Sequence, residues 1–269
     1  MATLIARYLL NEASGDALDS AGVGASDLTV YPTGHCGTDA DTVLERQYGG
    51  NPRYRITRHD TLCLDGGGSP THASVRKLVG SFPALDPNTS FTVAIKFVWE
   101  GNYTFRNLRK QGLVGTRQHP GNANGWVLSY LPNNQALAFG TTVGGLGEVV
   151  NGISGTPPSA GQEVEVHVTY TGTDTQYGAD RLRMYLDGAL DVEGAAPASF
   201  GFNGTNFTIG MNDHNSATFG AWERWQGQFW DCRIWSPLLT NEEISPPVVS
   251  PAGDIWLDGT FLAVETEEP

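Results

Sequence analysis

Runs of alternating hydrophobic and polar residues recur along most of the chain. In SFTVAIKFVWEG (90–101), every second side chain is aromatic or β-branched: Phe91, Val93, Ile95, Phe97 and Trp99. A period of two residues is typical of a strand that buries one face. The run EVEVHVTYTG (163–172) repeats the pattern, with Glu163, Glu165 and His167 opposite its valines. We therefore predict a long sheet strand in each run.

Shorter runs separated by turn residues predict more strands. GLVGTRQ, GWVLSYLP and ALAFGTT (112–118, 125–132, 136–142) are spaced by HPGNAN and NNQ, which predicts an antiparallel meander. Other predicted strands are LIARYLL, RLRMYLDG, ALDVEG, FTIGM and GQFWDCRIWSPLL. The one predicted helix is TNEEI (240–244), where Thr240 and Glu243 have the spacing of a capping box.

Two segments lack such patterns. We expect an irregular surface excursion from His35 to Thr71, which returns as a short strand at Thr61 to Leu64 and carries Arg46, Arg53, Arg55 and Arg58. This basic cluster is interpreted as a solvated or subunit-facing loop, with an anion site as the alternative. SPPVVSPAGD (245–254) is interpreted as a linker or strap because proline interrupts sheet pairing. We predict one domain, 1–245, and a tail, 246–269, that docks on it or on a neighbour.

The composition agrees with an all-β chain, since charged residues are 17% and glycines number 34 in 269 residues. The order of the runs from LLNEASGDALDSAG through SFTVAIKFVW, GWVLSY, VEVHVTYTG, LRMYLDG and FTIG to GQFWDCRIWSPLLTNEEI resembles the laminin-G-like jelly roll of the concanavalin A-like superfamily. The resemblance covers most of Ala2 to Ile244, with insertions at 32–72 and 101–112. It implies a two-sheet antiparallel jelly-roll sandwich that binds glycans or proteins on its concave face or at loops along one rim.

Charge and apolar runs exclude some partners. The net charge of -13 disfavours nucleic acid, which proteins hold through clusters of lysine and arginine. No stretch approaches the ~18 apolar residues of a membrane span, and MATLIARYLL lacks the features of a signal peptide. We therefore expect synthesis in a cytoplasm, with a lost leader as the alternative. The three cysteines favour buried free thiols, and a Cys36–Cys63 disulfide is left open.

Patterns of catalytic residues are weak. A glycosidase on this scaffold needs paired acids, as in E-x-D-x-x-E, and Glu163 and Glu165 are only the nearest match. His167 and Tyr170 fall on opposite faces of one strand, so they cannot form the base group of a lyase. No G-x-S-x-G occurs. We predict no catalytic residue and no enzymatic activity.

The resemblance implies a structural calcium where the first strand's acidic turn meets the last long strand. That strand's D-x-R-x-[WY] pattern is matched by Asp231, Arg233 and Trp235. Oxygen-rich side chains suit calcium, and the candidate ligands are Asn11, Glu12, Asp16, Asp19 and Asp231. The alternative is that Asp231 pairs with Arg233 or caps a backbone group.

NDHNSATFGAWERWQG (212–227) places aromatic rings beside amides and carboxylates, a pairing that recognises sugars. The candidate ligand-binding residues are Trp222, Trp225, Asn212, Asp213 and His214. The alternative is that either tryptophan covers the loop. Trp126 and Tyr103 are weaker candidates, whereas Trp99, Trp230 and Trp235 lie within predicted strands and are expected in the core.

Two functions follow. The first is a non-catalytic lectin-like or adhesive module on a phage or virus particle, as a decoration, fibre or tail-associated protein. It would be made in the host cytoplasm, form a homo-oligomer or part of a larger assembly, and bind cell-surface glycans or other virion proteins. The second is a secreted or cell-surface carbohydrate-active enzyme, a glycosidase or lyase, or its binding module. Asp187-Gly188, at the tip of RLRMYLDGAL, is predicted to be a hairpin turn and not a reactive group.

Overall fold

A computed structural model describes the fold. It describes residues 1–10, 20–21, 29–33, 42–47, 53–58, 63–64, 70–71, 75–80, 89–101, 111–116, 125–131, 135–143, 148–172, 181–195, 207–210, 225, 227–245, 248–249, 255–257 and 260–262. Of these, the side chains at 29–80, 141–151 and 248–262 are not described.

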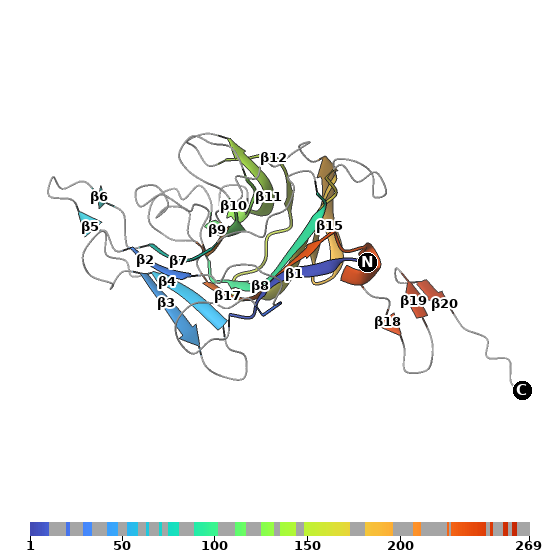
Figure 1. The fold of residues 1–269 in the computed structure, drawn as a ribbon, viewed down its shortest axis with the longest axis horizontal. Helices are drawn as coiled ribbons and strands as arrows, with labels where there is room; N and C mark the ends of the chain where they lie inside the picture. Colours follow the sequence, from blue (N-terminus) through green and yellow to red (C-terminus); the bar gives the residue numbers. More distant parts are fainter. Residues whose placement is uncertain are drawn as a thin grey trace, which may run out of the picture.

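The larger sheet is eight-stranded and antiparallel, in the order β15-β14-β13-β8-β17-β4-β3, with β1 also pairing with β17. Its strands are β1 (Thr3–Tyr8), β3 (Thr42–Gln47), β4 (Arg53–Arg58), β8 (Phe91–Trp99), β13 (Glu163–Tyr170), β14 (Arg181–Leu186), β15 (Ala189–Ala195) and β17 (Gly227–Ser236). The first strand and the last long strand therefore lie side by side (Figure 1).

The second sheet is seven-stranded, in the order β12-β11-β10-β9-β16-β7-β2. Its strands are β2 (Thr29–Thr33), β7 (Val75–Gly80), β9 (Gln111–Gly115), β10 (Val127–Leu131), β11 (Ala136–Val143), β12 (Glu148–Gly155) and β16 (Phe207–Ile209). The meander predicted from the turns at 119–124 and 133–135 is confirmed by the pairing of β9 with β10 and of β10 with β11. The two sheets confirm the antiparallel jelly-roll sandwich.

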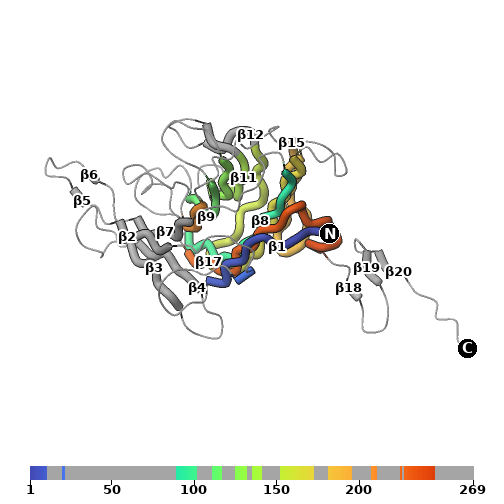
Figure 2. Tube along the Cα trace, in the orientation of Figure 1, coloured from blue at the N-terminus to red at the C-terminus, as the bar shows by residue number. Residues whose placement is uncertain are grey.

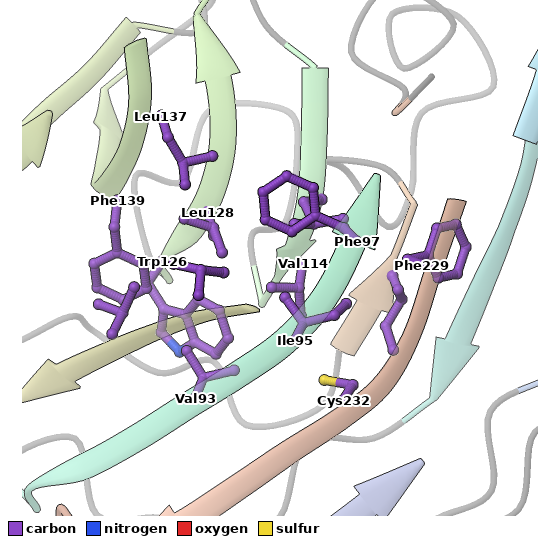
Figure 3. Close-up of a cluster of buried hydrophobic side chains, with 14 of the residues drawn as sticks. Val93, Ile95, Phe97, Val114, Trp126, Leu128, Leu137, Phe139, Phe229 and Cys232 are labelled. Atoms are coloured by element: carbon purple, nitrogen blue, oxygen red, sulfur yellow. The ribbon is translucent and has the colours of Figure 1, made fainter. Parts of the chain in front are cut away.

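The core lies between the sheets (Figure 3). All five residues predicted on the hydrophobic face of β8 belong to it, and Phe91, Val93, Ile95 and Phe97 are at most 1% exposed. From the second sheet, Leu128 of β10 and Phe139 of β11 face them, together with Trp126, which directly precedes β10. Cys232 is a buried free thiol, as predicted for that residue, and burial together with the nearby Asp231 raises its pKa.

The irregular excursion expected from His35 to Thr71 is wrong in its first part, but its short strand, predicted at Thr61 to Leu64, is confirmed at Cys63 and Leu64. Between His35 and Thr71, β3 and β4 pair as a hairpin, and β4 joins the large sheet beside β17. The strands β5 (Cys63–Leu64) and β6 (Pro70–Thr71) form a separate pair. Within the Pro-rich segment, β18 (Val248–Val249) pairs with β19 (Ile255–Leu257), which pairs with β20 (Thr260–Leu262). Figure 2 shows β1, β17 and β8 lying next to one another within the large sheet. The division into a domain and a tail at residue 245 stays a prediction.

The Asp187-Gly188 turn joins β14 to β15 as predicted. Asp187 has φ 50° and Gly188 has φ 84°, which matches the positive φ angles of a two-residue hairpin turn. The Asp187 carboxylate also accepts a hydrogen bond from the Glu165 amide at 2.8 Å, and the Asp187 amide donates to the Glu165 carbonyl at 2.8 Å. Asp187 is thus a corner of the chain that additionally fixes the backbone of β13.

Residues 238–245, which follow β17, pack against the large sheet, and we call this segment the strap. It contains α1 (Asn241–Ile244), whose predicted capping box is present: Thr240 and Glu243 exchange side chain to backbone bonds. Leu239 and Ile244 pack on Tyr185, whose hydroxyl donates to Asn241 Oδ1 at 2.5 Å. The Leu239 amide also donates to Thr92 Oγ1 at 2.8 Å, so the strap is bound to β8 and β14. In the described part of the chain, no helix is long and apolar enough to cross a membrane.

Candidate functional site

The outer face of the eight-stranded sheet carries a group of charged side chains that ion pairs connect. Alternation along β8, β13 and β17 turns one face of each strand into the core and places Lys96, Glu165 and Trp230 on the opposite face. Strand pairing places Glu165 of β13 opposite Lys96 of β8, and Lys96 opposite Trp230 of β17. The next row contains His167, Ala94 and Arg233. We call the side chains of Arg7, Lys96, Glu165, His167, Trp230, Asp231 and Arg233 the outer-face site.

Ion pairs connect these side chains across the strands. Arg7 Nε donates to Asp231 Oδ1 at 2.9 Å, and Asp231 Oδ2 lies 3.5 Å from Arg233 Nε. Arg233 in turn forms an ion pair with Glu165. The Glu165 carboxylate also lies 3.8 Å from Lys96 Nζ and 3.7 Å from His167 Nε2. Because burial and the nearby Arg7 disfavour its charge, the pKa of Arg233 is below its usual value.

His167 is the most buried ionisable side chain of this site, with 9% of its side chain exposed. Its ring stacks on Trp235 at 6.3 Å, and Nδ1 has no hydrogen-bond partner. Burial first, and the charge of Lys96 second, lower the pKa of His167 to about 4. The imidazole is therefore neutral at neutral pH.

A second group of ion pairs lies on this face at the β14–β15 edge. Glu193 accepts from Arg181 Nη1 at 2.8 Å and from Arg183 Nε at 2.9 Å, and the Arg183 hydrogen bond is the main reason its pKa is low. General acid catalysis requires a carboxyl group whose pKa is raised. The acids Glu165, Asp231 and Glu193 each form an ion pair with an arginine, so these carboxylates are held in place on the sheet.

Asp231 is the only candidate calcium ligand within the described residues. Its backbone has φ 48°, at a bulge between β17 and β8, and its carboxylate faces two guanidinium groups. Such cationic neighbours do not fit a calcium ligand, whereas they match the alternative of an ion pair with Arg233. No group of three metal-binding side chains lies together among the residues described. The other candidates, Asn11, Glu12, Asp16 and Asp19, lie outside those residues.

Trp225 is not an exposed platform for a sugar. Its side chain is 0% exposed and packs edge-on against Phe97 at 5.1 Å, so the ring belongs to the core. Its amide donates to the Gly210 carbonyl at 2.9 Å. The chain on either side of 211–224 is thereby joined by a backbone hydrogen bond. Trp222, Asn212, Asp213 and His214 lie outside the described residues and stay predicted ligand-binding residues.

Other aromatic residues depart from their expected positions. Trp126, a weaker surface candidate, is 0% exposed and packs on Phe91 and Phe139. Trp99 is in the core as expected, but Trp230 is half-buried on the outer face. In the sequence, Trp230 lies two residues after Gln228 and therefore on the face away from Phe229, and this alternation could have predicted its position.

These observations define a lectin-type jelly roll whose outer sheet face carries an ordered polar site. The chain belongs to the concanavalin A-like lectin/glucanase superfamily, since the model of that family matches residues 72–245. Comparison with curated protein sequences found no significant match.

Solved structures share the fold at low sequence identity. Domain 4 of an extracellular arabinanase from Geobacillus stearothermophilus, in complex with arabinotriose, is 13% identical with a TM-score of 0.55, covering 91% of this chain and 97% of that one. The binding domain of botulinum neurotoxin DC, in complex with rat synaptotagmin II, is 12% identical with a TM-score of 0.56. There the match covers 90% of this chain and 50% of the other, so the chain spans about half of that structure.

Proposed function

We propose that the chain is a non-catalytic, lectin-like module that binds glycans. The observation that carries this proposal is the outer-face site, in which half-buried Trp230 lies beside charged side chains that ion pairs hold in fixed positions. Sugars bind where an aromatic ring meets ordered polar groups. The arabinotriose bound by the arabinanase domain supports the choice of ligand class.

A glycan array probed with the full chain tests this function. We expect binding to a subset of glycans, and loss of some of it in Trp222→Ala if the 212–222 segment contributes as the sequence predicts. Trp126→Phe is the matched aromatic control, because Trp126 is buried in the core. Absence of binding to any glycan, with the chain folded, would contradict the proposal.

The non-catalytic part of the proposal needs its own measurement. The chain is incubated with the polysaccharides it binds, and new reducing ends and unsaturated products are followed over time. We expect neither, because the acids of the outer-face site are paired with arginines. Turnover abolished by Glu165→Gln would favour the carbohydrate-active enzyme, the alternative function.

We further propose that the module acts on the surface of a phage or virus particle, where it contacts glycans or neighbouring virion proteins. The support is the sequence pattern of an adhesive jelly roll followed by a Pro-rich segment. Mass spectrometry of purified particles is expected to detect the chain at a fixed ratio to the capsid protein. Light scattering with and without residues 246–269 tests the assembly, since identical masses would contradict a role of the tail in it.

A further inference from the structure

Lys96 has an unusual position for a charged residue. It lies in β8, between β13 and β17 within the large sheet, and every other residue of that strand is buried. Its side chain is 34% exposed. Burying part of a lysine in the middle of a sheet costs free energy unless its ammonium group has a partner. The partners of Lys96 therefore decide what this position is for.

Glu165, the cross-strand neighbour, satisfies Lys96 only in part. The distance from Lys96 Nζ to Glu165 Oε2 is 3.8 Å, which is longer than a hydrogen bond. Glu165 Oε1 is already engaged by Arg233. An ammonium group has three donors, so Lys96 keeps donors available for a ligand. Because Glu165 is tied to Arg233, it cannot turn fully towards Lys96.

Trp230 lies on the other side of Lys96. The two residues are direct cross-strand neighbours, which places their Cβ atoms about 5 Å apart. Trp230 is half-buried, as is Gln228, which shares its face of β17. An aromatic ring and a cation at this separation match a sugar ring that carries a carboxylate. The C–H face of the sugar would contact the indole, and its carboxylate would reach the ammonium.

Resting on the proposed glycan-binding function, we propose that the row Trp230–Lys96–Glu165 recognises acidic glycans, with Lys96 binding the carboxylate of a uronic or sialic acid. Charge supports this ligand class. The chain carries a net charge of -13, which repels anions at long range, so an acidic ligand needs local cations. The outer-face site supplies Lys96, Arg7 and Arg233, which are 34%, 39% and 20% exposed.

Calorimetric titration with an oligogalacturonate and with its methyl ester tests the row, because the two ligands have the same rings and differ in charge. The wild-type chain should bind the acid more tightly, and less so at high salt. Lys96→Met should weaken binding of the acid about tenfold or more, since hydrogen bonds to charged groups are the strong ones, and leave the ester unchanged. Trp230→Leu should weaken binding of both ligands.

Arg181→Met is the matched control. It also removes one positive charge from the large sheet, but at the β14–β15 edge, where Arg181 pairs with Glu193. Its binding should equal that of the wild type, and thermal melting shows that each variant is folded. Equal effects of Lys96→Met and Arg181→Met, or equal affinity for acid and ester, would overturn the inference.

The remaining outcomes separate this inference from the function on which it rests. If poly-glutamate binds as tightly as the oligogalacturonate, the row recognises anions in general and the assignment to glycans is wrong. If neutral glycans bind and Lys96→Met has no effect on any ligand, the inference fails while the lectin function stands. If no glycan binds, both fail together.

Discussion

At the scale of single residues, His167 makes the stability of the protein depend on pH. The folded state lowers the pKa of His167 from 6.5 to about 4, so the unfolded state binds the proton more readily. The contribution of His167 to stability should therefore be constant above pH 6.5 and fall as the pH drops towards about 4. Below about pH 4 this group should cause no further loss. The loss is on the order of 3 kcal/mol.

Unfolding by urea at a series of pH values measures this contribution. His167→Gln cannot titrate, so its stability should fall less than that of the wild type between pH 6.5 and about 4. Carboxylates titrate in the same window, and the difference between the two curves isolates His167. Parallel curves would show that His167 is not neutral in the folded protein, whatever the charges of Glu165 and Lys96 beside it.

The Asp187-Gly188 turn gives a second test at this scale. Asp187→Asn keeps an acceptor for the Glu165 amide and tolerates positive φ, so stability and ligand binding should stay within about 0.5 kcal/mol of the wild type. Gly188→Val should cost about 2 kcal/mol or more, because a β-branched residue resists φ 84° and its Cβ would meet Ser245 Oγ at 3.3 Å. Equal urea midpoints for the two variants would contradict this account of the turn.

At the scale of elements, the strap depends on the capping box of α1. Thr240→Ala removes the acceptor of the Glu243 amide and should cost about 1 kcal/mol. The loss should be local, seen as faster hydrogen exchange of the Leu239 amide, which is bound to Thr92. Glu242→Gln, in the same helical turn but outside the capping box, is the control. If both variants exchange at the wild-type rate, the box does not hold the strap.

Sequence patterns predicted the elements whose own residues follow a simple repeat or carry a local cap. The strands β8 and β13 were found because one face is entirely hydrophobic, and α1 because its cap is local. By contrast, β12 was missed because Asn and Gly interrupt its alternation, and β3 and β4 because charged residues hide theirs. Pairing between distant strands supplies what such segments lack in local signal.

The same distinction applies to the site. The outward direction of Glu165 and His167 followed from parity along one strand. The bond from Arg7 to Asp231 spans 224 positions, and only the pairing of β1 with β17 brings these residues together. Burial of Trp225 likewise depends on Phe97, from another strand, so its sequence neighbours alone indicated a surface loop.

At the scale of the whole molecule, Asp231 joins the first strand to the last long one, and its role decides between an ion pair and a calcium site. Asp231→Asn keeps the φ of 48° accessible but removes the charge shared by Arg7 and Arg233. Because Asp231 is only 12% exposed, we expect a loss on the order of 2 kcal/mol. Glu193 also pairs with arginine, but its side chain is 41% exposed, so Glu193→Gln should lose less than about 1 kcal/mol of stability.

Calorimetric melting with calcium and with a chelator distinguishes the two roles of Asp231. If the carboxylate serves Arg7 and Arg233, the melting temperature of Asp231→Asn should lie below that of the wild type by the same interval in both buffers. A calcium ligand would behave differently, because a bound ion stabilises only the folded state that holds it. The chelator would then lower the wild type towards the variant and remove the interval. We expect the interval to persist, since two guanidinium groups already neutralise Asp231 and repel a further cation.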